Sequence, residues 1–348
     1  MTFEELFSVD RSNMFRLLKQ FPDQVREAVA IGNSAGLRKR IRAVKQIVLT
    51  GMGGSAISGD LLAGHLADSL RVPLTVNRHY SLPKFVGKET LLIVSSYSGG
   101  TEETISAYKE GSRKGAQVLC ITSGGRIGSM ARAKRHMQIT IPGGLPPRAA
   151  LGYSFFPLLI GLSRFGLVPR KSKEIRETIQ LLDERSSTYG NPDPSANKAL
   201  QVAENLRNRV GVLYAGTGMP GAVATRWRGQ IAENAKAMAW THVVPEMNHN
   251  EIVGWRIPQE QLKETAVLLL RDRGDHKRVQ RRMDLTRGIL ADTSLHINEI
   301  WSEGTSPLAR MFSLIYLGDW VSYYLAILHG IDPTPVITID HLKAELAK

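Results

Sequence analysis

The sequence predicts an α/β protein built from two doubly wound parallel sheets. Short apolar runs alternate with longer segments of helical periodicity, the pattern of parallel strands with helices on both faces. The same order of apolar strand, glycine-rich turn and helix begins again in the C-terminal half, which indicates duplication. The 348 residues, 43% of them hydrophobic, can bury a large core and exceed the usual size of one domain.

Four apolar runs in the first half predict the strands of the first sheet. They are QIVLTG (46–51), TLLIVSSYS (90–98), AQVLCITS (116–123) and HMQITIPGG (136–144). Helical segments at 55–70, 101–115 and 126–134 separate them. The single cysteine, Cys120, lies within the third run and is predicted to be a small core residue, since no internal disulfide is possible.

A helical span from Leu151 to Leu182 and the polar segment STYGNPDPSAN (187–197) follow. We therefore divide the chain into an N-terminal domain with leading helices (1–150), a helical connector and linker (151–195), and a C-terminal domain with terminal helices (196–348). The second sheet is predicted from GVLYAG (211–216), ETAVLLL (264–270) and SLHINEIW (294–301), and a long helical pattern covers 224–240. The nearly all-apolar helix at 306–328 is explained by burial in a core or a dimer interface.

The net charge of +13 favours anionic ligands in general. The densest basic stretch, Arg271 to Arg287, is interrupted by acids and has no interleaved aromatics, so a solvated helix face explains it better than a nucleic-acid surface. The N-terminus lacks the basic-then-apolar order of a secretory signal, and the longest apolar stretches, such as YSFFPLLIGL (153–162), are too short for a membrane span. The cytoplasm is the expected compartment.

Two glycine motifs raise the question of a nucleotide cofactor. GMGGSA (51–56) and GTGMPG (216–221) satisfy the dinucleotide fingerprint after a strand. That fingerprint normally requires an acidic residue about 20 residues further on, to hold the ribose. Asn77 and Arg78 stand there instead, so no nucleotide cofactor is expected.

A stronger signal follows the second strand of the first half. Ser96, Ser98 and Thr101 surround two glycines where a helix begins. Hydroxyls and backbone N–H groups at a helix N-terminus can hold a phosphate. The simpler explanation is that Ser98 or Thr101 caps the helix, but a cap accounts for one hydroxyl and leaves the others unexplained.

These motifs carry a family resemblance. GMGGSAISGD followed by SSYSGGTEET resembles the sugar isomerase domain, and PPRAALGYSF, AENAKAMAWTHVVPEMNHNEIVGW and DPTPVITIDHLKAEL are similar to the bifunctional phosphoglucose/phosphomannose isomerase family over nearly the whole chain. The resemblance implies flavodoxin-like sheets and a substrate-phosphate site at Gly54, Ser55, Ser96, Ser98 and Thr101. The family's phosphate loop usually has Asn where this chain has Gly100, which affects only the fine position of the phosphate.

The resemblance also implies a reaction and its catalytic residues. Aldose–ketose isomerisation of glucose 6-phosphate or mannose 6-phosphate to fructose 6-phosphate needs ring opening, a base and a cation near the enediolate. Glu233 maps onto the family's catalytic base, although without the resemblance an exposed helix glutamate paired with Lys236 would be the better interpretation. His249 maps onto the ring-opening acid/base, and Arg148 and Lys343 map onto the family's active-site cations. Without the resemblance, both cations would be taken for ordinary surface residues.

No metal or other cofactor is expected. Glu246, His249 and Glu251 are close in sequence but lack the spacing of a metal motif. The expected partners are a phosphorylated hexose and a second copy of the chain, in a homodimer with the active site near the subunit interface; nucleic acid and membrane are not expected partners. A non-catalytic phosphosugar sensor and the isomerase half of an amidotransferase fit less well, because the chain has neither a DNA-binding headpiece nor an N-terminal cysteine.

Overall fold

The computed structural model describes residues 4, 8–37, 41–293 and 296–346. Contacts divide the chain into two compact units, with one division inside helix α8 (Ser172–Tyr189). The five-stranded unit comprises Phe21–Gln180 and Ser306–Ala309, and the four-stranded unit comprises Met1–Gln20, Leu181–Thr305 and Arg310–Lys348. The sequence alone assigns the N-terminal segment to the first domain, whereas the Tyr316 hydroxyl of the four-stranded unit donates to the Leu18 carbonyl at 2.8 Å.

The sheet of the five-stranded unit has the order β2-β1-β3-β4-β5, and every pair in it is parallel. Its strands are β1 (Gln46–Thr50), β2 (Leu74–Asn77), β3 (Thr90–Ser95), β4 (Gln117–Thr122) and β5 (Met137–Thr140). This is the flavodoxin-like order, so the fold prediction is confirmed for this sheet.

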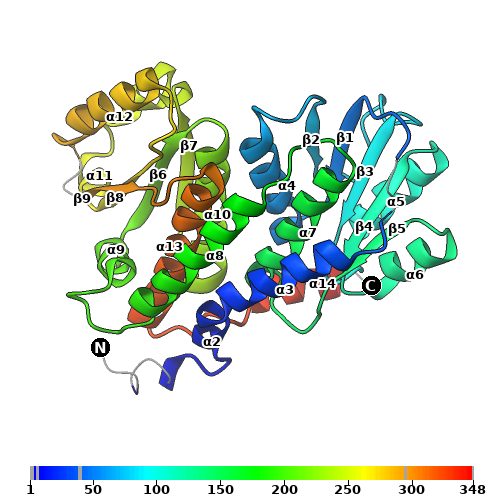
Figure 1. Cartoon of the computed structure of the whole chain (residues 1–348). Coiled ribbons are helices and arrows are strands. Elements are labelled where there is room, and N and C mark those ends of the chain that lie inside the picture. Colours follow the sequence, from blue (N-terminus) through cyan, green and yellow to red (C-terminus); the bar gives the residue numbers. More distant parts are fainter. Residues whose placement is uncertain (1–3, 5–7, 38–40, 294–295, 347–348) are drawn as a thin grey trace. The chain divides into compact units, whose positions relative to one another are not determined.

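Helices cover both faces of this sheet (Figure 1). Helix α4 (Gly53–Leu66) packs on the face of Leu49, where a Cβ added to Gly59 would lie 2.9 Å from that side chain. Helices α5 (Glu102–Arg113) and α6 (Gly125–Ala133) contribute to a core cluster on the opposite face, which includes Val48 and the buried Cys120. Alternate strand residues thus supply two cores.

Helices α3 (Phe21–Ser34) and α7 (Leu151–Arg164) pack closely against each other in the same unit. A Cβ on Gly32 would lie 2.9 Å from Ile160, so a glycine allows the close approach. The predicted helical span from Leu151 to Leu182 is in fact two helices, because the chain leaves α7 after Arg164 and Gly166 has φ +73° before α8 begins.

The sheet of the four-stranded unit has the order β7-β6-β8-β9, again entirely parallel. Its strands are β6 (Val210–Gly216), β7 (Ala239–Val244), β8 (Thr265–Arg271) and β9 (His296–Trp301). The order repeats that of the first sheet without its fifth strand, which agrees with the predicted duplication. Two predicted residues of the last strand, 294–295, lie outside the described residues.

The helical pattern predicted over 224–240 is wrong at its C-terminal end. Helix α10 (Met219–Gln230) continues as a π-helical turn, Ile231–Ala235, and Lys236 then adopts the left-handed conformation with φ 53°. The chain next forms the edge strand β7. Only the last of its six residues is fully buried, so it lacks the continuous apolar run that marks the central strands.

The remaining helices of the four-stranded unit include one long apolar helix, α13 (Pro307–Leu328). The others are α2 (Met14–Lys19), α9 (Lys198–Leu206), α11 (Gln259–Lys263), α12 (Lys277–Leu290) and α14 (Ile337–Leu346). By length and hydropathy α13 is the one helix among the described residues that could cross a membrane, but 94% of its apolar window is buried inside the protein. It is therefore a core helix, one of the two explanations offered by the sequence.

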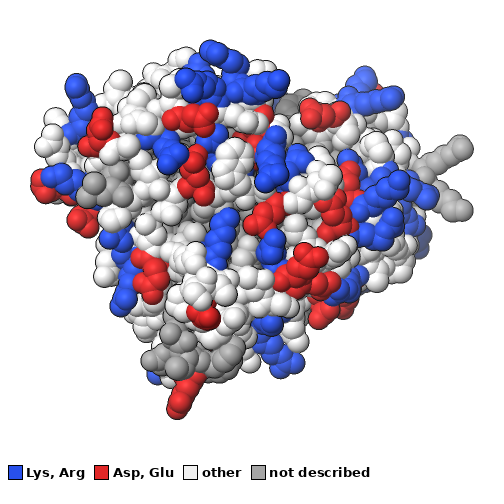
Figure 2. Space-filling model, turned by 60° about the vertical axis from the view of Figure 1, so that its left-hand side comes forward, with Lys and Arg blue, Asp and Glu red and all other residues white. Residues whose placement is uncertain are grey.

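The surface carries charges of both signs. On the face in Figure 2, Lys and Arg side chains are interspersed with Asp and Glu. The basic stretch from Arg271 to Arg287 lies at the end of β8 and on α12. Arg271 itself is buried, pairs with Asp284 at 2.9 Å and Glu299 at 2.5 Å, and therefore has a structural role.

Candidate active site

Two loops meet at the carboxyl edge of the five-stranded sheet, where β1 and β3 lie side by side and the strand order reverses. Such a switch point is the usual ligand site of an open α/β sheet. The first loop leads into α4, whose second residue is Gly54. The second loop leads into α5, which begins at Glu102.

The hydroxyl groups of these loops contact one another and the backbone. Ser96 Oγ lies 3.1 Å from Thr101 Oγ1, and Ser98 Oγ accepts the N–H of Gly100 at 3.3 Å. Thr101 occupies the N-cap position of α5, yet its side chain makes no capping hydrogen bond. The capping explanation therefore fails for Thr101. Ser55 Oγ accepts the N–H of Tyr97 at 3.2 Å and links the two loops.

Glycine is required where these loops touch the loop after β4. Gly99 has φ +68°, and a Cβ there would lie 2.0 Å from the Gly124 carbonyl oxygen. Gly125 has φ +62°, and its Cβ would lie 2.3 Å from the Ser98 carbonyl oxygen. Both glycines therefore combine a left-handed backbone with a backbone-to-backbone approach. The supporting loop at 122–125 is missing from the predicted site, although a glycine pair directly after a strand is a visible signal.

Arg148 lies beside the first loop. It belongs to the 3₁₀ turn Pro147–Ala149, and a Cβ on Gly54 would lie 3.0 Å from the Pro147 carbonyl oxygen and 3.6 Å from Arg148 Cα. Arg148 is only 4% exposed. Taken without the resemblance, the sequence suggests a surface arginine, and that expectation is wrong because the turn packs against the start of α4.

Glu233, His249 and Lys343 lie on three separate elements of the four-stranded unit. Glu233 is half-buried in the π-helical turn that extends α10. Lys236 Nζ donates to the backbone carbonyl of Glu233 at 2.8 Å and to that of Pro333 at 3.0 Å, which fixes the end of this turn. Lys343 is exposed on α14.

His249 is exposed at the end of a 3₁₀ turn, Glu246–His249, that is anchored on both sides. Before it, Asn248 donates to Thr286 Oγ1 at 2.9 Å. After it, one carboxylate oxygen of Glu251 accepts the buried Tyr214 hydroxyl and the other lies 2.9 Å from His242 Nδ1.

A metal ligand set is not apparent around His249. Both carboxylate oxygens of Glu251 have protein partners, and Glu246 Oε1 accepts from Asn250 at 3.0 Å. Within residues 4, 8–37, 41–293 and 296–346, no group of three or more His, Cys, Asp or Glu could hold a metal ion.

Known protein families match each half of the chain, and known proteins match the chain over nearly its whole length. The SIS domain matches residues 40–143, and the bacterial phospho-glucose isomerase C-terminal SIS domain matches residues 195–346. A bifunctional phosphoglucose/phosphomannose isomerase from Caldicellulosiruptor bescii is 44% identical over 96% of this chain and 99% of its own. The chain belongs to the bifunctional phosphoglucose/phosphomannose isomerase family.

A second member of this isomerase family, from Aquifex aeolicus, is 36% identical over 90% of this chain and 93% of its own. Among solved structures, a glucose-6-phosphate isomerase like protein from Thermus thermophilus has a TM-score of 0.61 and 20% identity, and the match covers 95% of this chain and 96% of that one. The latter likeness concerns the fold alone.

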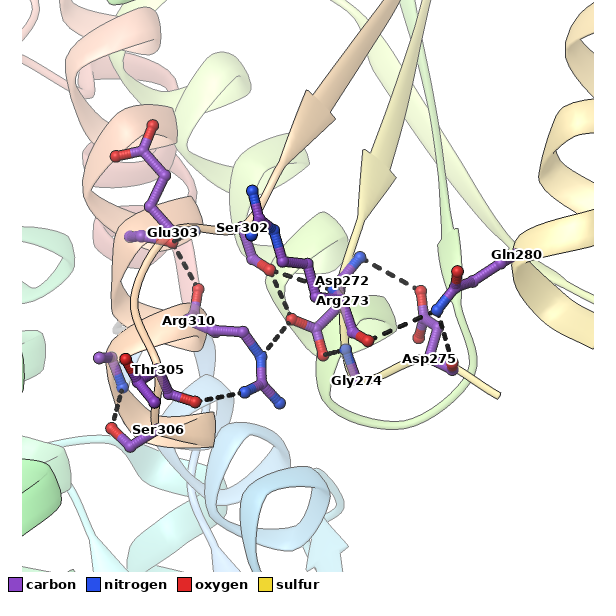
Figure 3. A network of polar contacts seen from close by, with 12 residues as sticks. Asp272, Arg273, Gly274, Asp275, Gln280, Ser302, Glu303, Thr305, Ser306 and Arg310 are labelled. Atoms are coloured by element: carbon purple, nitrogen blue, oxygen red, sulfur yellow. Dashed lines mark hydrogen bonds and ion pairs between the residues drawn. The ribbon is translucent and has the colours of Figure 1, made fainter. Parts of the chain in front are cut away.

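The two sheets of this chain carry different side chains at their carboxyl edges. The position of the β3 loop is taken in the four-stranded unit by the loop after β8, where Asp272 accepts from Ser302 Oγ at 2.6 Å and Arg310 Nε at 2.9 Å (Figure 3). Asp275 lies against Gly216 at the end of β6, and burial raises its pKa to about 6. The hydrogen bond from the Asp272 N–H lowers this pKa, whereas the charge of the Asp272 carboxylate raises it. Carboxylates thus stand where the other sheet has hydroxyls.

Proposed function

We propose that this chain catalyses the reversible isomerisation of glucose 6-phosphate, and of mannose 6-phosphate, to fructose 6-phosphate through a cis-enediol. The observation that carries the proposal is the 44% identity to a bifunctional phosphoglucose/phosphomannose isomerase over 96% of the chain. The hydroxyl-lined loops at the edge of the five-stranded sheet support a phosphorylated substrate.

In this proposal the phosphate is held by Gly54, Ser55, Ser96, Ser98 and Thr101. Backbone N–H groups at the starts of α4 and α5 donate to it, and the helix dipoles favour its negative charge. The contact between Ser96 and Thr101 keeps both hydroxyls directed within the loop. The substrate is thereby fixed at the end remote from the reacting carbons, which lowers the entropic part of the barrier.

Proton transfer is assigned to residues of the four-stranded unit. His249 and Lys343 assist ring opening, in which the ring oxygen gains a proton and the O1 hydroxyl loses one. Glu233 then removes the proton from C2 of the aldose and returns it to C1 of the enediol, while the O2 hydroxyl proton passes to O1; this gives the ketose with no net loss of a proton. Arg148 supplies a fixed positive charge for the enediolate oxygen.

Glucose and mannose phosphates differ only at C2 and give the same enediol. An active site that lets the intermediate rotate about C2–C3 can therefore protonate either face. We further propose that the protein acts in the cytoplasm as a homodimer whose active site lies near the subunit interface, since the family resemblance suggests that His249 can serve the neighbouring subunit.

The test supplies fructose 6-phosphate to the purified protein and measures glucose 6-phosphate and mannose 6-phosphate separately. Wild type should form both, also with a chelator present. Glu233→Gln should lower kcat by about 10²–10⁴-fold, the usual contribution of a general base. Glu204→Gln, an exposed glutamate on α9, is the matched control and should keep full activity.

The outcomes separate the reaction from the residue assignment. If wild type forms neither product, the proposed activity is wrong. If Glu233→Gln retains full turnover, the reaction stands but another group is the base. Deuterium at C2 of product formed in D₂O would show that the transferred proton exchanges with solvent, as expected for an enediol formed by a carboxylate base.

A further inference from the structure

A cavity of about 590 Å³ opens on the five-stranded unit, away from the hydroxyl loops. Its lining comes from α3, α7, α8 and the segment that joins α7 to α8, and it includes no residue of 51–55 or 96–101. The apolar side chains of Leu159, Ile160 and Ile175 form part of it. Its volume is typical of a small-molecule site.

The charged lining of this cavity is entirely positive. Arg164, Arg170, Lys171 and Arg176 line it, and none of its lining residues is acidic. Arg164 is held in place, because its Nη1 donates to the carbonyl of Ala35 at 2.6 Å at the end of α3.

The other guanidinium groups are available to a ligand. Arg170 and Arg176 are exposed, and neither has a hydrogen bond or ion pair to another residue in the part of the chain that the structure describes. Arginines that point into a cavity without a protein carboxylate are well suited to bidentate contact with phosphate oxygens.

We propose that this cavity binds a small phosphorylated metabolite with an apolar ring system, of the nucleoside phosphate class, at a site separate from the substrate-phosphate loops. The arginines would take the phosphate groups, and the leucine and isoleucine side chains would pack against the base. A phosphosugar alone would leave this apolar surface uncovered, which is why the cavity fits a nucleotide better than a second hexose phosphate.

A chain of polar contacts leads from this cavity to α4. Lys171 Nζ lies 2.7 Å from Glu174 Oε1, and Glu174 Oε2 lies 3.7 Å from Nε2 of His65 in the last turn of α4. Neither ring nitrogen of His65 has a hydrogen-bond partner among the described residues, and burial lowers its pKa to about 4. A phosphate that draws Lys171 from Glu174 would change the charge beside His65, at the opposite end of the helix that begins at the substrate loop.

The experiment is calorimetric titration of the full chain with ADP, in about 0.15 M salt and with saturating fructose 6-phosphate present to occupy the substrate loops. Pyrophosphate tests the charge alone, and adenosine tests the apolar contact alone. ADP should bind with a Kd below about 1 mM, pyrophosphate more weakly, and adenosine least, because the charge-assisted hydrogen bonds provide most of the affinity. The NMR signal of His65 should shift when ADP binds.

Two charge reversals on α8 distinguish the cavity from the general positive field. Arg176→Glu, which changes a lining residue, should weaken ADP binding at least tenfold without changing isomerase activity. Lys173→Glu makes the same change of charge on an exposed residue of α8 outside the lining, and it should weaken binding less than threefold. Equal losses in the two variants, displacement of ADP by fructose 6-phosphate, or no binding at 1 mM ADP would each overturn the proposal.

Discussion

Arg226 and Asp319 form a buried ion pair that ties α10 to α13 close to the turn that carries Glu233. Arg226 Nη2 lies 2.8 Å from Asp319 Oδ2 and Nε lies 3.1 Å from Oδ1, while Gln230 donates to Oδ1 at 2.9 Å. The two side chains are only 3% and 5% exposed. Asn234, next to Glu233, adds a bond of 2.9 Å to Ser322 of α13.

Asp319→Asn should destabilise the four-stranded unit by about 3–5 kcal/mol, because a buried guanidinium would lose its charge partner. The lost bidentate contact accounts for most of this, since each hydrogen bond to a charged group contributes about 1.5–3 kcal/mol. Urea unfolding followed by circular dichroism measures the loss. Steady-state kinetics at low temperature should also show a lower kcat, because the Glu233 turn loses one of its attachments to α13.

A double variant tests the reasoning. Arg226→Met with Asp319→Leu removes both charges while keeping most of the volume, so it should be far more stable than Asp319→Asn. A loss below about 1 kcal/mol for the single variant would mean that water reaches the pair and screens it. A double variant as unstable as the single one would show that the fold depends on the pair's geometry rather than on charge compensation.

Three further changes test other parts of the molecule. Glu251→Gln should lower kcat about tenfold with little change in the KM of fructose 6-phosphate, because the segment carrying His249 loses one anchor; a raised KM with normal kcat would contradict this. Gly99→Ala should raise that KM at least tenfold, whereas Gly166→Ala, with a similar φ but nothing near its Cβ, should leave it unchanged. Because the pKa of Asp275 is raised, its contribution to stability is largest near pH 4, where the carboxyl group is protonated, and is lost as the pH rises through about 6. Asp275→Asn should therefore increase the free energy of unfolding in urea more at pH 7.5 than at pH 5.

The central strands were predictable from the sequence, and two edge strands were not. β1, β3, β6 and β8 are buried on both faces and therefore appear as continuous apolar runs. β2 and β7 occupy the same outer position in the two sheets, and only the last residue of each is fully buried, so neither appears as a continuous apolar run. The helix-forming sequence before β7 also made the predicted helix too long, so that it ran into the strand.

The site was predictable only where polar side chains directly follow a strand of clear apolar pattern. Ser96 and Thr101 follow a strand of clear pattern, so their proximity could be expected before the contact of 3.1 Å was known. The burial of Arg148 could not, because it results from packing between residues far apart in sequence. The same holds for Tyr214 and Glu251, whose hydrogen bond depends on how the chain after β7 folds back over β6.

The two sheets share a strand order, but the loops at their carboxyl edges differ in their suitability for binding a phosphate. The same strand order places a loop beside the first strand of each sheet. The hydroxyl and N–H groups of the loop in the five-stranded unit attract a phosphate, whereas the carboxylates of the loop in the four-stranded unit repel one. In the four-stranded unit Asp272 already accepts from Arg310 of α13 and from Ser302 after β9, so these two donors are satisfied within the chain. One phosphate-holding loop per chain is therefore expected, and a second hexose phosphate would have to overcome both the negative charge of Asp272 and the loss of its present hydrogen bonds.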